Sequence, residues 1–130
     1  MKTILFLCVA NAGRSQMAEG LARAMAPREG YEFLSAGSQP RTLNPLAVRA
    51  LAETGIDIAH HYAKGLDDVP LAQADVIVTL CADEVCPYVP GERPVQRFHW
   101  PLLDPTSLDD FRSVREELRR RLPALWSDQP

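Results

Sequence analysis

Residues 8–15 combine a cysteine, a glycine, an arginine and a serine in an order that could bind and attack a tetrahedral oxyanion. The backbone amides of such a loop can point inward around an anion, and the positive end of a following helix adds to them. That field would hold Cys8 as a thiolate, which is the nucleophilic form of cysteine. The rigid fork of Arg14 can bind two oxygens and neutralise the charge that builds during attack.

The remaining side chains of this loop have supporting roles in the predicted site. Ser15 can donate a hydrogen bond to the Cys8 sulfur, and Asn11 can tie the loop together. The alternative is that Cys8 is a small core hydrophobe and Arg14 a surface charge. The residues that we expect to bind the oxyanion are Val9, Ala10, Asn11, Ala12, Gly13 and Arg14.

The elements around the loop are those that an anion site requires. Residues 3–7 form a continuous apolar, β-prone run, typical of a strand buried on both faces of a parallel sheet. Met17, Leu21 and Met25 recur every four residues, which predicts a helix over residues 15–26. A strand, a glycine-containing loop and a helix therefore follow one another.

Strands and helices alternate along the rest of the chain. We predict strands at residues 31–35, 75–80 and 95–100, and helices at residues 44–54 and 107–122, capped by Asn44 and Ser107. The alternation implies an α/β fold with a parallel sheet in a single domain, residues 1–130. Ligands of such sheets bind beyond the carboxyl ends of the strands, so Cys8, Cys81 and Asp104 should converge there.

The composition of the chain disfavours some classes of binding partner and indicates a cell compartment. The net charge of -3 disfavours a nucleic-acid partner. No apolar run approaches the roughly 20 residues that span a bilayer. Three cysteines are too few and too odd in number for a secreted disulfide framework. Lys2 and the apolar residues 4–10 imitate a short secretory signal, but cleavage there would delete the first strand. We expect a cytoplasmic monomer without a bound cofactor and without a membrane partner.

Several short motifs resemble a known enzyme family. Cys-x5-Arg-Ser near the N-terminus, with Asn11 inside it, resembles the low-molecular-weight tyrosine phosphatase fold. Nearly the whole chain is similar to the thioredoxin-coupled arsenate reductases built on that fold. The matching segments are residues 14–20, 35–37, 44–45, 78–81, 86–87, 99–100 and 104–105. The resemblance implies four parallel strands flanked by helices in a Rossmann-like three-layer arrangement.

The other two cysteines decide which chemistry the resemblance implies. A phosphatase needs one thiol, whereas reduction of As(V) to As(III) needs a second thiol to supply an electron pair. Cys8 would attack arsenate while Asp104 protonates a departing oxygen, and Cys81 would then attack the Cys8 sulfur. Cys86 would move the disulfide to Cys81–Cys86, where thioredoxin reduces it. The catalytic residues that we expect are Cys8, Arg14, Ser15, Cys81, Cys86 and Asp104.

The chain departs from the family pattern in the segment that joins the last two cysteines. Only four residues separate Cys81 from Cys86, fewer than in the best-known relatives. If this segment is helical when reduced, positions five apart do not share a face, so closing the disulfide requires unwinding. We therefore predict a mobile segment here. Two unrelated buried cysteines are the alternative.

A second departure concerns a metal ion. Some relatives hold potassium with positions that match Asn11, Glu19 and Ser35 together with an aspartate, where this chain has Lys64. An ammonium group could replace the ion, so we expect no potassium dependence. Asp67 or Asp68 would supply the missing carboxylate if this register were displaced.

The histidines do not form a zinc motif. His60, His61 and His99 lack the His-x3-His spacing, and no Cys-x-x-Cys pair accompanies them. We therefore expect surface or packing histidines and no metal site.

Three functions remain open from the sequence. The first is arsenate reduction coupled to thioredoxin, with phosphate or sulfate as substrate analogues. The second is hydrolysis of phosphotyrosine or small phosphate esters by Cys8, Arg14 and Asp104. Phosphatases of this fold often carry two tyrosines after the Asp-Pro pair, but here Thr106 and Ser107 follow. The third is a redox-sensing oxyanion binder without enzymatic activity.

Overall fold

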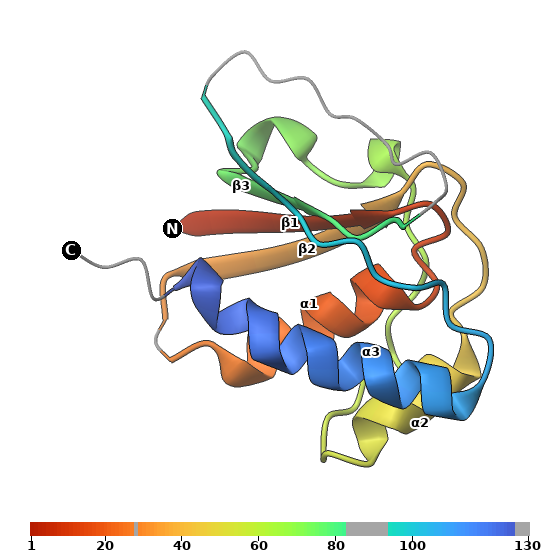
Figure 1. Ribbon diagram of the computed structural model, residues 1–130. Coiled ribbons are helices and arrows are strands. Elements are labelled where there is room, and N and C mark those ends of the chain that lie inside the picture. The colour runs from red at the N-terminus through yellow and green to blue at the C-terminus, as the bar shows by residue number, and fades with distance from the viewer. Residues whose placement is uncertain (28, 83–93, 127–130) are drawn as a thin grey trace.

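The sheet is built around the apolar N-terminal run. The computed structural model describes residues 1–27, 29–82 and 94–126 (Figure 1). Its four strands, all parallel and in the spatial order β2-β1-β3-β4, are β1 (Lys2–Cys8), β2 (Tyr31–Gly37), β3 (Val76–Thr79) and β4 (Gln96–His99). The predicted α/β fold with four parallel strands is confirmed. Because β1 is central and the chain reverses its winding there, the loop after β1 lies at the switch point where such sheets bind ligands.

The helices follow the predicted periodicity with small differences at their ends. They are α1 (Arg14–Met25), α2 (Pro45–Ala52) and α3 (Leu108–Arg121), with the short 3-10 helices η1 (Leu66–Asp68), η2 (Leu71–Gln73) and η3 (Leu122–Leu125). Asn44 and Ser107 cap α2 and α3 as predicted, because their side chains accept hydrogen bonds from the Leu46 and Asp110 amides. Helix α2 ends before the predicted residue 54, in a turn that leads to Gly55 at φ +83°.

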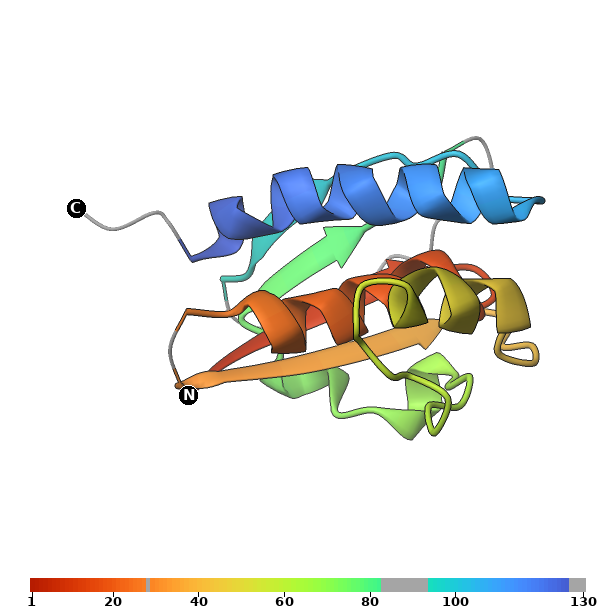
Figure 2. The same ribbon diagram turned by 90° about the horizontal axis from the view of Figure 1, so that it is seen from below.

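The two faces of the sheet are covered differently. Ile4 and Phe6 share one apolar cluster with residues of all three α-helices, whereas Leu5 and Leu7 belong to a second cluster. The second cluster is closed by side chains from η1 and η2, among them Leu66 and Leu71. Figure 2 shows α1 and α3 running side by side along the sheet. Strand β1 is therefore buried on both faces, as its unbroken apolar sequence predicts.

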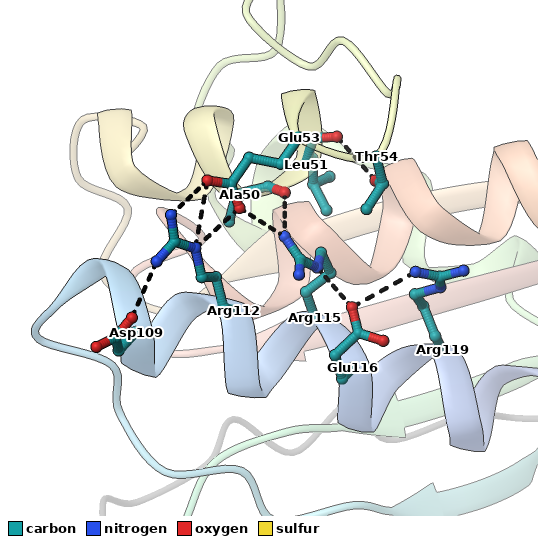
Figure 3. A network of polar contacts seen from close by, with 9 residues as sticks. All are labelled: Ala50, Leu51, Glu53, Thr54, Asp109, Arg112, Arg115, Glu116 and Arg119. Carbon is teal, nitrogen blue, oxygen red and sulfur yellow. Dashed lines mark hydrogen bonds and ion pairs between the residues drawn. The ribbon is translucent and has the colours of Figure 1, made fainter.

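Helices α2 and α3 are joined by a network of charged side chains (Figure 3). Arg112 and Arg115 of α3 both bind the carboxylate of Glu53, at the end of α2, with nitrogen–oxygen distances of 2.6 and 2.9 Å. Arg115 also donates to the backbone oxygen of Ala50. Hydrogen bonds from Arg112 and Arg115 lower the pKa of Glu53 to about 2. Two arginines from one helix thus hold the carboxyl-terminal end of another.

Within the residues that the structure describes, no helix is both long and apolar enough to cross a membrane.

Candidate active site

Cys8 is the last residue of β1 and its sulfur is buried among polar groups. The side chain is 2% exposed. Its Sγ atom lies 2.9 Å from the Ser15 Oγ atom and accepts a hydrogen bond from the Asn11 amide at 3.3 Å. Asn11 Nδ2 donates to Ser15 Oγ at 2.7 Å, so the serine hydroxyl proton remains available for the sulfur. Two hydrogen-bond donors therefore face the Cys8 sulfur.

The carbonyl groups of the loop after Cys8 are tied down by the segment that follows β2. The amides of Gln39, Arg41 and Asn44 donate to the carbonyl oxygens of residues 9, 10 and 12, at 2.8 to 2.9 Å. A trans peptide group holds its C=O and N–H in opposite directions. The amides that follow these three carbonyls must therefore point away from the 39–44 segment, as the contact of the Asn11 amide with the sulfur shows directly.

Three amides of the loop are available to an anion. In the described part of the chain, the amides of Ala10, Ala12 and Gly13 have no acceptor. All three residues are only half-buried, and they line the same pocket as Cys8 and Val9. The first turn of α1 begins directly after them, with its positive dipole end nearby. The loop therefore has three backbone N–H groups without an acceptor among the residues that line this pocket.

Arg14 is a buried guanidinium that the structure holds beside this loop. Its side chain is 6% exposed. Nη1 donates to the carbonyl oxygen of Leu102 at 2.9 Å and lies 3.5 Å from that of Leu80. Nη2 lies 3.7 Å from Oδ1 of Asp104, whose side chain is 71% exposed. The segments after β3 and β4 therefore orient Arg14, and Asp104 stands at the solvent side of the same site.

The pocket has a volume of about 360 Å³, and it includes side chains that the sequence did not single out for the site. Arg41 and Asn44 come from the segment after β2, and Phe111 comes from α3. The sequence predicts only a helix cap at Asn44 and a helical position for Phe111, and no motif includes Arg41. The lining residues are Cys8, Val9, Ala10, Ala12, Gly13, Arg14, Arg41, Asn44, Asp104, Pro105 and Phe111.

Cys81 lies close to this pocket without lining it. The amide of Leu80 donates to the carbonyl oxygen of Leu7 at 3.0 Å, which sets Leu80 and Cys81 beside the end of β1. Cys81 is 1% exposed and disulfide-bonded, whereas Cys8 is a free thiol. Cys86 and the predicted mobile segment between the two cysteines lie outside the described residues.

Gln16 is a buried residue that was not among the predicted site residues. Its Nε2 donates to Asn11 Oδ1 at 2.9 Å and to the carbonyl oxygen of Tyr62 at 2.7 Å. Asn11 adopts a left-handed φ of 49°, which costs free energy in a residue other than glycine. Its Oδ1 atom also accepts a hydrogen bond from the Lys64 amide at 2.7 Å. Gln16 and Lys64 thus hold Asn11 in the conformation that aims its amide at Cys8.

Glu19 is a buried carboxylate between two cations. Lys64 Nζ lies 3.6 Å from its Oε1, and Arg23 Nη2 lies 2.5 Å from its Oε2. Ser35 also donates to Glu19 Oε1. A potassium ion bound by this group would meet the Lys64 ammonium, so these side chains do not fit the ion. Asp68 accepts a hydrogen bond from the Gly65 amide at 2.7 Å.

Two of the histidines lie within hydrogen-bond distance of uncharged polar side chains. His61 Nδ1 lies 3.0 Å from Gln16 Oε1, and His99 Nδ1 lies 2.7 Å from Thr79 Oγ1. Burial lowers the pKa of His61, which favours its neutral form. In the described part of the chain, no three His, Cys, Asp or Glu side chains gather as metal ligands.

The chain is similar to known proteins over nearly its whole length. The family model described as low molecular weight phosphotyrosine protein phosphatase matches residues 3–129. Arsenate reductase 2 of Staphylococcus saprophyticus is 39% identical over 131 residues, which cover 98% of both chains.

Solved structures of arsenate reductases are also similar to this chain. A structure described as an arsenate reductase in the phosphate binding state superposes with a TM-score of 0.82 at 31% identity, covering 96% of each chain. The thioredoxin-dependent arsenate reductase of Corynebacterium glutamicum has a TM-score of 0.76 at 34% identity, with 97% of this chain and 60% of that chain covered. The chain belongs to the low-molecular-weight phosphotyrosine protein phosphatase family.

Proposed function

We propose that this protein is an arsenate reductase in which Cys8 is the nucleophile and Cys81 the first resolving thiol. The observation that carries the proposal is the placement of a second cysteine at the end of β3, beside the strand that ends in Cys8. A phosphatase of this fold does not require that thiol. The relatives named arsenate reductase, at 39% identity over nearly the whole chain, support the same choice.

In the first step the Cys8 thiolate attacks the arsenic atom of arsenate. The amides of Ala10, Ala12 and Gly13, together with Arg14, hold the oxygens that stay on arsenic. The As–O bond opposite the sulfur breaks, and Asp104 delivers the proton that lets this oxygen leave as water. The product is a thio-arsenate ester, in which the Cys8 sulfur is bonded to As(V). Ser15 stabilises the sulfur before the attack, since its hydroxyl lies 2.9 Å away.

In the second step Cys81 reduces the arsenic. Its thiolate attacks the Cys8 sulfur, so that a Cys8–Cys81 disulfide forms while the S–As bond breaks. The electron pair of that bond remains on arsenic, which leaves as arsenite, As(III). Because Cys81 is buried outside the pocket lining, its sulfur has to move toward Cys8 during this step.

The third step returns Cys8 to its thiolate form. Cys86 attacks Cys81, which transfers the disulfide to Cys81–Cys86 and releases Cys8. A dithiol protein then reduces this disulfide, and the thioredoxin dependence of the Corynebacterium glutamicum relative favours thioredoxin for that role. The cycle needs a reducing compartment, so we place the protein in the cytoplasm. No potassium ion takes part, since Lys64 provides the cation beside Glu19.

A coupled assay tests the function directly. Arsenate should cause NADPH consumption in the presence of thioredoxin and thioredoxin reductase, and omission of thioredoxin should abolish it. A Cys8→Ser variant should show no consumption, because serine is a poor nucleophile at neutral pH. Absence of consumption by the wild-type protein would refute arsenate reduction.

A phosphatase remains the second candidate, because the anion loop, Arg14 and Asp104 lie together without Cys81 in the pocket. A Cys81→Ser variant separates the two functions. It should lose arsenate turnover yet keep any hydrolysis of an aryl phosphate, because hydrolysis requires only one of the three cysteines, Cys8. If wild-type protein hydrolyses the aryl phosphate well and consumes no NADPH with arsenate, the phosphatase is the correct function.

A further inference from the structure

Arg41 stands at the anion pocket with an unneutralised charge. Its backbone amide donates to the carbonyl oxygen of Ala10 at 2.9 Å, so the segment that supports the anion loop also brings Arg41, which is exposed to solvent, to the lining of the pocket. Among the described residues, the Arg41 guanidinium has no hydrogen bond and no ion pair. Arg14, by contrast, is buried and bound by backbone carbonyls and by Asp104.

The charges in the pocket leave a role for a second cation. Its titratable and charged lining residues are Cys8, Arg14, Arg41 and Asp104. A Cys8 thiolate and a doubly charged oxyanion together carry three negative charges, while Arg14 supplies one positive charge. Since Asp104 contributes no positive charge in either protonation state, Arg41 is the other lining group that offsets this excess.

The direction from which Cys8 attacks determines which part of the ligand lies nearest to Arg41. In-line attack by Cys8 leaves three oxygens toward the loop amides and Arg14, and turns the fourth away from the sulfur, toward the pocket mouth. In the doubly charged ion of free arsenate or phosphate this fourth group is a hydroxyl, whose oxygen accepts hydrogen bonds. In an aryl phosphate it is an ester oxygen, which carries little charge and is followed by an apolar ring.

We propose that Arg41 is a specificity-determining residue that favours free, doubly charged tetrahedral oxyanions over phosphate esters. This assignment rests on the proposed function, because it concerns the substrate of the same site. The guanidinium binds the outer oxygen by a charge-assisted hydrogen bond that an ester cannot accept equally well. Lysine would keep the charge but lose the two-pronged geometry.

Binding of inorganic phosphate, measured calorimetrically on the reduced protein, tests the assignment without turnover. Arg41→Ala should raise the phosphate Kd by roughly three- to tenfold, between the effects of an exposed ion pair and a charge-assisted hydrogen bond. Arg41→Lys should give a smaller increase. Arg49→Ala removes the same charge from the exposed surface of α2, so its Kd should stay within a factor of 1.5 of the wild type.

Kinetics provide the specificity test. In Arg41→Ala the KM for arsenate should rise by a similar factor with little change in kcat, while the KM for p-nitrophenyl phosphate should change less than twofold. The dependence of phosphate affinity on salt should also become shallower. Equal Kd values for Arg41→Ala and Arg49→Ala, or equal KM increases for arsenate and the ester, would overturn the role of Arg41. Failure of the wild-type protein to bind phosphate and to reduce arsenate would instead overturn the proposed function together with it.

Discussion

The Arg14 guanidinium and the Asp104 carboxylate meet at the anion pocket, with Nη2 and Oδ1 3.7 Å apart. They come from the start of α1 and from the loop beyond β4, at opposite ends of the chain. Arg14 is buried, whereas Asp104 is largely exposed to solvent. The pair therefore places a buried guanidinium, held by backbone carbonyl groups, beside a carboxyl group that water can reach.

Asp104→Asn should impair the first chemical step. The amide keeps the size of the side chain but cannot donate a proton to the leaving oxygen, so kcat for arsenate should fall by roughly 100-fold. KM should change little, because Arg14 and the loop amides remain. Steady-state NADPH consumption with thioredoxin measures both constants.

Asp109→Asn is the matched control for Asp104→Asn. Asp109 is an exposed carboxylate of α3 that pairs with Arg112 and does not line the pocket. The kcat of Asp109→Asn for arsenate should equal that of the wild type. A kcat for Asp104→Asn within a factor of three of the wild type would contradict the general-acid role.

Lys64→Asp should convert the Glu19 cluster into a cation site. The substitution removes the ammonium 3.6 Å from Glu19 and adds a carboxylate near Ser35 and Asn11. Potassium at about ten times its Kd would then raise the melting temperature by roughly 3–6 °C relative to sodium at equal ionic strength. Thermal unfolding in KCl and in NaCl measures the difference.

Two further proteins complete that experiment. The wild type should have the same melting temperature in KCl as in NaCl, because it keeps the Lys64 ammonium group. Lys64→Ala should also show no difference between the two salts, because it gains no oxygen ligand. A potassium-specific stabilisation of the wild type would show that Lys64 does not replace the ion.

Gly37→Ala should disturb the anion loop as well as the fold. A Cβ atom at this position would lie 2.4 Å from the Val9 carbonyl oxygen and 2.9 Å from the Asn11 amide nitrogen. Backbone atoms cannot yield as a flexible side chain can, so the free energy of unfolding should fall by about 2 kcal/mol. Because the displaced atoms belong to the loop, the rate of Cys8 alkylation by iodoacetamide should fall too.

Gly30→Ala distinguishes a loop effect from a general loss of stability. Gly30 has a φ of +104° with open space around it, so alanine there is strained without contacting the loop. This variant should lose stability and keep the alkylation rate of Cys8. Similar alkylation rates in both variants would mean that Gly37 has no special relation to the site.

Glu53→Gln should reveal a pH-dependent contribution to stability from the contact in Figure 3. Arg112 and Arg115 lower the pKa of Glu53 from 4.5 to about 2, so the native state favours its ionised form. Its stabilisation should be complete above pH 4.5 and disappear as the pH falls through about 2. Urea unfolding of both proteins from pH 2 to 6 gives this difference. A difference that stays constant over the range would contradict the pKa shift.

Local interactions explain why much of the site was predictable from the sequence. Cys8, Arg14 and Ser15 lie on one strand–loop–helix unit, so their geometry follows from the apolar run of β1 and the periodicity of α1. The caps at Asn44 and Ser107 are equally local, since each involves residues within three positions. The amino-acid sequence by itself therefore determined the order of strands and helices along the chain and the placement of Cys8 and Arg14 at the two ends of one loop.

Tertiary structure decided the contacts between distant segments. The 39–44 segment turns the loop carbonyls outward, Asp104 reaches Arg14, and Lys64 reaches Glu19. A backbone hydrogen bond from Arg41 to Ala10 holds Arg41 beside the pocket, and no sequence motif predicts this contact. Such contacts depend on how strands and helices pack against one another, and residue periodicity specifies which face of an element is buried but not which distant side chain it meets.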